Sequence, residues 1–203
     1  MSIHVEKPDQ FDLVEQAIDI FDTAQPLRGS LAEKYLTGLG LTVTEAAQHV
    51  LRFHPHFRFG DLGLPCLVAY VQDSLTNEPA GVHLTALSPD AIVLGLPGAT
   101  GCKTIGSIDC YSVIKLGGEP HASAELTIAA TIEAALAAMM FGFGPAWSVL
   151  SAQGIAEFPK PRFDIIERLT VIVDSDEAIE AAAKCNARWG NVVRIAVAPE
   201  VWQ

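Results

Sequence analysis

Two aspartates, Asp174 and Asp176, follow an apolar run at residues 169–173 and precede a segment with helical spacing. In an open α/β sheet, ligands bind outside the carboxyl ends of the strands, so acids at such an end are well placed for chemistry. Carboxylate oxygens bind hard cations such as Mg²⁺ or Mn²⁺, with water or phosphate oxygens completing the coordination shell. The pair therefore indicates a divalent-cation site. A structural alternative remains, in which Asp176 caps the following helix and Asp174 ends the strand.

The C-terminal part of the chain supplies the elements that would position these acids. Short apolar runs alternate with helical segments there. The apolar runs cover residues 126–130, 146–151, 168–174 and 192–198, and the helical segments cover 131–142, 153–158 and 176–189. Strands buried on both faces lose the in-out alternation of a half-solvated sheet, and strand-helix-strand units join parallel strands by right-handed crossovers. The pattern predicts an α/β fold whose parallel strands are flanked by helices.

The N-terminal part has a different pattern. Apolar residues recur at helical spacing over residues 11–24, and two possible capping boxes, Ser30 to Glu33 and Thr42 to Glu45, predict two more short helices. Residues 66–87 predict strand, turn and strand, which is an antiparallel hairpin. The glycine-rich segment 94–118 predicts a loop with one short strand at 111–116. We expect two domains, a small α+β region at 1–120 and an α/β domain at 121–203.

Composition narrows the class of protein. The 203 residues are 50% hydrophobic and 18% charged, with a net charge of −11, which indicates a globular chain that repels nucleic acid except at a local basic patch. The N-terminus lacks the basic and apolar pattern of a signal peptide, so we expect a cytoplasmic protein. Glu133, Gly144 and Pro145 interrupt the apolar stretch 126–150, so it predicts strand, helix and strand, with no membrane contact.

The order of these elements resembles the Toprim domain, in the form found in phage and plasmid primase-helicase proteins. The resemblance runs from about residue 18 to the C-terminus. It is carried by LRGSLAEKYLTGLGL (27–41), LRFHP (51–55), GVHLTALSPD (81–90), SVIKLGG (112–118), LTIAATIEAALAA (126–138), AWSVLSAQGIAEF (146–158), LTVIVDSDEAIEAAAKCNARW (169–189) and VVRIAVAPE (192–200). It implies a Toprim-like four-stranded parallel sheet, a role in DNA replication or mobile-element metabolism, and Mg²⁺ or Mn²⁺ at Asp174 and Asp176, which match the family's D-x-D.

The residue that carries catalysis in that family is missing. Its first strand ends in a Glu-Gly pair, and Ala130 and Thr131 stand at these positions. A methyl group cannot move a proton or bind a cation, so the centre is degenerate. Further departures from the family pattern remove charge or flexibility: Ile179 replaces a glycine, and Leu39 and Leu84 replace basic residues.

Two other residues match functional positions of the family. Glu133 keeps its second glutamate, in the first turn of the expected helix, and could act as a replacement catalytic carboxylate or help to hold the cation. A glutamate near a helix start also has a plain dipole role. Lys115 matches a basic position and could contact a nucleic-acid phosphate, although an isolated exposed lysine is the ordinary alternative.

Three functions follow from the residues and the resemblance together. The first is a degenerate primase-like protein that binds a divalent cation and a nucleic acid or a replication protein, with nucleotidyl transfer lost or altered. The second is an active Mg²⁺-dependent primase or nuclease that uses Glu133. The third is a protein-interaction module, which the acidic balance favours over direct DNA binding. The sequence indicates no particular oligomeric state.

Overall fold

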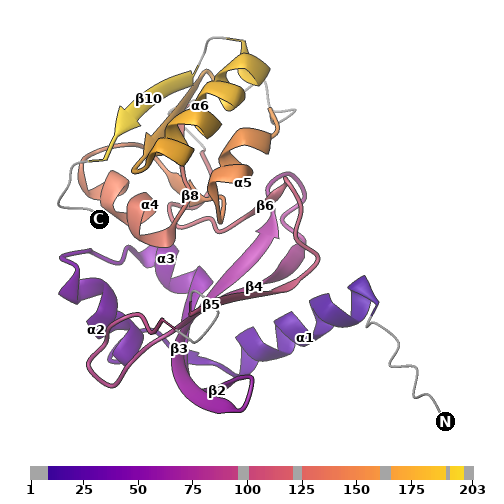
Figure 1. Ribbon diagram of the computed structural model, residues 1–203, viewed down its shortest axis with the longest axis vertical. Coiled ribbons are helices and arrows are strands. Elements are labelled where there is room, and N and C mark those ends of the chain that lie inside the picture. Colours follow the sequence, from indigo (N-terminus) through magenta and orange to yellow (C-terminus); the bar gives the residue numbers. More distant parts are fainter. Residues whose placement is uncertain (1–8, 96–100, 121–124, 161–165, 191–192, 199–203) are drawn as a thin grey trace.

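The computed structural model describes residues 9–95, 101–120, 125–160, 166–190 and 193–198. Within these ranges the chain forms two β-sheets with helices packed on both of them. Figure 1 shows the C-terminal sheet with its helices at the top of the molecule and the N-terminal sheet with its helices below. The structure is mixed α/β, as predicted.

The N-terminal sheet is larger than the predicted hairpin. Its six strands pair antiparallel in the order β1-β2-β3-β4-β5, with β6 also paired to β3. The predicted hairpin is present at its centre as β3 and β4, but the strand at β2 was not predicted, and β5 lies in a segment predicted as loop. The bounds are β1 (Gln25–Pro26), β2 (Leu51–Phe59), β3 (Leu62–Asp73), β4 (Pro79–Ala86), β5 (Cys102–Gly106) and β6 (Ser112–Val113).

Three helices accompany this sheet: α1 (Gln10–Thr23), α2 (Leu31–Gly38) and α3 (Glu45–Val50). The predicted cap at Ser30 is confirmed, because its hydroxyl accepts a hydrogen bond from the Glu33 N–H at 3.2 Å. The cap predicted at Thr42 is wrong by two residues. The α3 helix is capped by Thr44, whose hydroxyl accepts from the Ala47 N–H at 3.1 Å.

The C-terminal sheet confirms the prediction of a four-stranded parallel sheet. Its strands are ordered β10-β9-β7-β8, and each neighbouring pair is parallel. The apolar stretch that resembled a membrane span is strand, helix and strand, as predicted, and no helix in the described ranges has the length and apolar character needed to cross a bilayer. The bounds are β7 (Glu125–Ala129), α4 (Ile132–Met140), β8 (Ala146–Ser148), α5 (Ala152–Glu157), β9 (Arg168–Val173), α6 (Asp176–Trp189) and β10 (Val193–Val197).

The two sheets share a hydrophobic core. Helix α1 packs on one face of the N-terminal sheet, while α2, α3 and α4 bury their apolar sides in one cluster with the opposite face. The α4 helix also contacts β7, β8 and β9, and α6 packs against β9 and β10. Ile114 and Ser148 form an isolated antiparallel bridge between the two halves. The division of the chain at residue 120 stays a prediction, and the cluster around α4 is continuous across it.

Candidate functional site

The carboxyl ends of β7 and β9 lie at the same edge of the parallel sheet. The two strands are neighbours, with Ile128 paired to Val171, and the chain leaves them at Ala130 and Asp174. Ala130 is therefore at the position where the resemblance expects a catalytic glutamate. Thr131 caps α4, because its hydroxyl accepts a hydrogen bond from the Ala134 N–H at 3.1 Å. This cap places Glu133 in the first turn of α4, beside the sheet edge.

Glu133 and Asp174 line one cavity of about 490 Å³ between α2 and α4. Both side chains are half-buried. The cavity wall is otherwise mostly apolar, with Leu41, Ala137 and Met140 among its residues. Two acidic residues that are 41 residues apart in the chain thus line the same cavity, which is open to solvent on one side. A carboxylate pair in a partly desolvated cavity attracts cations more strongly than the same pair would in open water.

Tyr35 holds Glu133 in place across the two halves of the molecule. Its hydroxyl donates a hydrogen bond of 2.8 Å to Oε1 of Glu133, from α2 to α4. Burial raises the pKa of Tyr35, and the neighbouring Glu133 carboxylate raises it further, so the hydroxyl stays protonated and remains a donor. The tyrosine is 98 residues from its partner in the chain, and the only sequence signal for it was its place on the apolar side of α2.

Asp176 is separated from this cavity. It is exposed in the first turn of α6 and is not among the residues of the cavity wall. The predicted alternative for Asp176, a helix cap, is wrong: Ser175 is the cap, since its hydroxyl accepts from the Ala178 N–H at 3.2 Å. Among the described residues, no group of three or more His, Cys, Asp or Glu side chains is arranged to hold a metal ion. The structure therefore brings Asp174 together with Glu133, and the role of each acid stays a prediction.

A second cavity, of about 410 Å³, adjoins the position of the missing glutamate. Ala130 lines it together with His83, Cys102 and Ser148, and it shares Tyr35, Thr131 and Glu133 with the first cavity. The Nδ1 atom of His83 lies 2.9 Å from the Thr104 hydroxyl. Burial lowers the pKa of His83 and is also the main factor that raises the pKa of Cys102. Both side chains are thereby held in their neutral forms.

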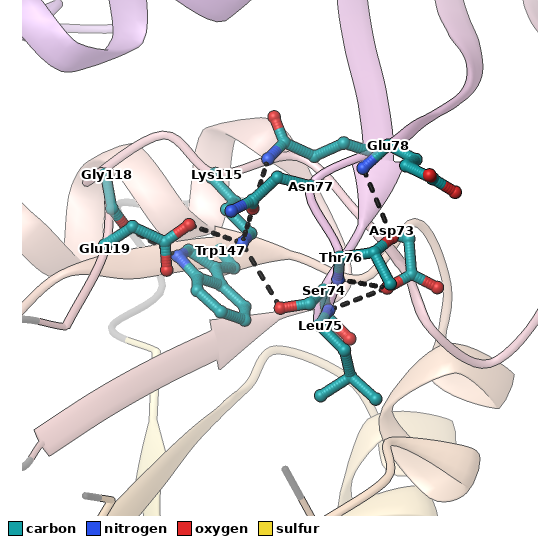
Figure 2. Close-up of polar contacts among 11 residues, drawn as sticks. Asp73, Ser74, Leu75, Thr76, Asn77, Glu78, Lys115, Gly118, Glu119 and Trp147 are labelled. Atoms are coloured by element: carbon teal, nitrogen blue, oxygen red, sulfur yellow. Dashed lines mark hydrogen bonds and ion pairs between the residues drawn. The ribbon is translucent and has the colours of Figure 1, made fainter. Parts of the chain in front are cut away.

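Lys115 has a buried environment and not the exposed one expected of a phosphate contact. Its side chain is 4% exposed, and Figure 2 shows its ammonium group inside a polar network. Nζ donates to the Ser74 carbonyl oxygen at 3.2 Å, to Oε1 of Glu119 at 2.6 Å and to Oδ1 of Asn77. It also lies 4.5 Å from the ring centroid of Trp147. The nucleic-acid-binding role of Lys115 stays a prediction, and this environment does not support it.

The network around Lys115 ties the β3–β4 turn to the C-terminal half. Ser74 and Asn77 belong to that turn, which is itself ordered by Oδ1 of Asp73, the acceptor for the backbone N–H groups of Leu75 and Thr76 (Figure 2). Trp147, on β8, donates from Nε1 to the Gly118 carbonyl oxygen at 2.8 Å. The sequence carried no signal for these partners, because they are distant in the chain and ordinary in type.

The overall fold of the chain is similar to that of several solved primase structures. The E. coli primase catalytic core superposes with a TM-score of 0.63 at 14% identity, covering 93% of this chain and 72% of that one. The fold is similar to that of DnaG primase catalytic cores. A primase domain from Pseudomonas aeruginosa gives a TM-score of 0.61 at 14% identity, with 95% and 72% coverage. A DnaG primase catalytic domain bound to ssDNA gives 0.62 at 16% identity, with 94% and 74% coverage.

Sequence comparison adds one family match. The family described as "Domain of unknown function (DUF7146)" matches residues 12–97, which lie in the N-terminal half. A search of curated protein sequences gives no match. At these low identities the structural likeness establishes only the fold. The activity has to be argued from the residues that line the two cavities between the N-terminal and C-terminal halves, which we call the cleft.

Proposed function

We propose that this chain is a degenerate, Toprim-type, primase-like protein of DNA replication or mobile-element metabolism. It holds a divalent cation in the cleft between its two halves and has lost nucleotidyl transfer. The observation that carries the proposal is the cavity shared by Glu133 and Asp174 in a fold similar to DnaG catalytic cores. The binding partner in this role is a nucleic acid or another replication protein.

The donor set of the cavity suits a hard cation. Mg²⁺ and Mn²⁺ are commonly bound by one or two protein carboxylates, with water completing the coordination shell. Glu133 and Asp174 supply two carboxylates from the ends of adjacent elements, and Tyr35 engages only one oxygen of Glu133. Asp176 is exposed in the first turn of α6 and is not part of the cavity wall, so the proposal gives it no direct contact with the ion. A divalent ion held in this way would neutralise the acids and allow a phosphate group to approach.

The residue at the end of β7 explains why we propose the loss of catalysis. Ala130 has no group that can accept a proton or bind an ion, and Thr131 is used to cap α4. Lys115, the one basic residue that the sequence assigned to phosphate, is directed to partners inside the protein. Among the residues that the structure describes, the cavity wall holds two carboxylates and no lysine or arginine, which supports cation binding without nucleotidyl transfer.

One observation favours a second candidate function. Glu133 lies in the same cavity as Asp174, and this is the placement that a replacement catalytic carboxylate would need. In that case the chain would be an active Mg²⁺-dependent primase or nuclease. Its activity would depend on Glu133 together with Asp174.

A manganese titration combined with a primer-synthesis assay tests the proposal. We expect wild-type protein to bind Mn²⁺, followed by electron paramagnetic resonance, and Glu133→Gln or Asp174→Asn to weaken binding about tenfold or more. Asp61→Asn, which removes an exposed acid at the β2–β3 turn, is the matched control and should bind as wild type does.

The two assays separate the two functions. The proposal expects no primer synthesis and no nicking from single-stranded DNA, nucleotides and Mn²⁺. Synthesis or nicking that Glu133→Gln abolishes would establish the enzyme instead. Wild-type protein that binds no Mn²⁺, or an Asp174→Asn variant that binds it equally well, would refute the cation site.

A further inference from the structure

Exposed apolar side chains gather around the acidic cavity. Leu39 is 51% exposed, Met140 is 47% exposed and Phe141 is 62% exposed, and all three line the cavity that contains Glu133 and Asp174. Large apolar side chains that are exposed singly are normal on a protein surface. Several that share one concave site with charged groups are typical of a binding surface.

A neighbouring cavity extends this surface. It measures about 480 Å³, shares Tyr35 and Leu39 with the first cavity, and adds Ile92, which is 63% exposed. We call the two together the α2–α4 groove, defined by Leu39, Ile92, Met140 and Phe141 on its walls and by Glu133 and Asp174 in its depth.

The charged residues that line the groove favour a positively charged ligand. Its described lining contains three carboxylates, of Glu133, Asp174 and Asp90, and Lys34 is the only cationic residue there. The whole chain carries a net charge of −11. A phosphate backbone would be repelled by this surface, while a positive ligand would be attracted to it. The apolar walls require that the same ligand also carry apolar side chains.

We infer that the α2–α4 groove binds an arginine-bearing, apolar segment of a partner protein. The inference specifies the partner of the proposed non-catalytic role and rests on that role; the guanidinium group would compete with the divalent cation for Glu133 and Asp174. A guanidinium group fits here because its planar fork pairs with carboxylates and stacks on aromatic rings, and Phe141 presents such a ring with 62% of its surface exposed. The methylene stem of arginine packs on apolar walls such as Met140. A hydrated metal ion would use the two carboxylates but leave the exposed walls without a function.

Apolar residues on either side of the arginine in the partner segment would contact the rest of the groove. Leu39 lines both cavities of the groove, and Ile92 lines the neighbouring cavity of about 480 Å³, so the apolar wall continues from the acidic cavity into its neighbour. An apolar side chain one helical turn from the arginine would reach them. Binding then combines one desolvated charge contact with burial of apolar surface, which is the usual composition of an interface hot spot.

Fluorescence anisotropy with a pair of synthetic peptides tests the inference. The probe is a labelled amphipathic peptide of about 15 residues, with one central arginine and leucines one helical turn to each side. Its partner carries citrulline, which keeps the shape and loses the charge, in place of arginine. We expect the arginine peptide to bind about tenfold or more tightly than the citrulline peptide. This comparison uses wild-type protein only, so it does not depend on the folding of a variant.

Matched variants locate the site. Phe141→Ala and the double change Glu133→Gln with Asp174→Asn should each weaken the arginine peptide about tenfold. Phe11→Ala is the control for the aromatic change, because Phe11 is 69% exposed on α1, which packs on the other face of the N-terminal sheet. Asp61→Asn is the control for the charge change. Both controls should bind as wild type does.

Several results would overturn the inference. Equal binding of the two peptides, or equal weakening by Phe11→Ala and Phe141→Ala, would show that no specific groove is involved. Displacement of the peptide by single-stranded DNA would make the groove a nucleic-acid site. If the peptides fail to bind while Mn²⁺ binds and no primer is made, the inference fails and the proposed function stands. Primer synthesis by the wild type would instead refute the proposed function.

Discussion

Replacing Lys115 with methionine removes the ammonium group and keeps a side chain of similar length. We expect Lys115→Met to lower the free energy of unfolding, because Lys115 is 4% exposed and its three donor contacts are internal. The chief loss is the donor to the carbonyl oxygen of Ser74, a residue that is 1% exposed. A buried acceptor without a partner is costly, more so when the lost donor is charged.

The contacts of Lys115 do not contribute equally to the cost. Asn77 Oδ1 also accepts from Nε2 of Gln72 at 3.0 Å, and the side chain of Glu119 is 30% exposed and can be rehydrated, so these two acceptors lose less. The methionine sulfur can replace part of the contact with the Trp147 ring. Taken together, the change should cost about 3 kcal/mol, at the upper end of the range for leaving a buried acceptor without its donor.

Urea unfolding and a thermal melt measure this effect. A loss of about 3 kcal/mol corresponds to a fall in Tm of roughly 6–12 °C for a chain of this size. Lys103→Met is the matched control, since Lys103 is exposed on β5, and it should change stability by no more than about 0.5 kcal/mol. The reasoning would be refuted if Lys115→Met were as stable as wild type. The variant should in that case bind DNA with a slope of log affinity against log salt concentration that is smaller by about one unit. That result would mean that Lys115 contacts a phosphate.

Three further changes test the surroundings of the cleft. Ala130→Glu should tighten Mn²⁺ binding about tenfold by adding a third carboxylate beside Glu133, and an unchanged affinity in the titration would contradict this placement. Tyr35→Phe removes the hydrogen bond to Glu133 and should lower the free energy of unfolding by about 1–2 kcal/mol in urea, whereas no change would mean that this bond adds nothing. Burial lowers the pKa of His83, so the unfolded chain takes up a proton near pH 6.5 while the folded chain does not; stability should therefore fall as the pH drops below about 6.5. His83→Gln should remove this part of the pH dependence, and identical unfolding curves for both proteins at each pH would argue against it.

The N-terminal sheet shows why a single sequence predicts some strands and not others. The hairpin of β3 and β4 was predictable because its strands are apolar and joined by a recognisable turn. The β2 strand was not, since it contains Pro55 and a register shift between His54 and Phe57 that breaks the alternation. The β5 strand is an edge strand with three exposed residues in a row, so it has no apolar periodicity to detect.

Some features of the candidate site could also be predicted from the sequence, and others could not. The position of Asp174 at the end of a strand could be predicted, because an apolar run and the residue that follows it are local features. The predicted cation ligands were Asp174 and Asp176, with Glu133 as a further candidate. The cavity brings Asp174 together with Glu133 and with Tyr35, which was not predicted, and Asp176 is not in its wall. Ser175, not Asp176, caps α6, and a serine between two aspartates offers no pattern that distinguishes these roles.

The amino-acid sequence by itself determined that strands and helices alternate in the C-terminal half and that its strands pair in parallel. It also determined the acid at the end of β9 and the alanine, Ala130, that follows β7. Each of these depends on residues that are close together in the chain, where apolar spacing directly reflects local structure. Only the tertiary structure decided that Tyr35 reaches Glu133 across 98 residues and that Lys115 points inward to Ser74 across 41. Such contacts form when separate elements pack on a common core, and the residue types at the two ends do not encode which of many possible partners will be brought within reach.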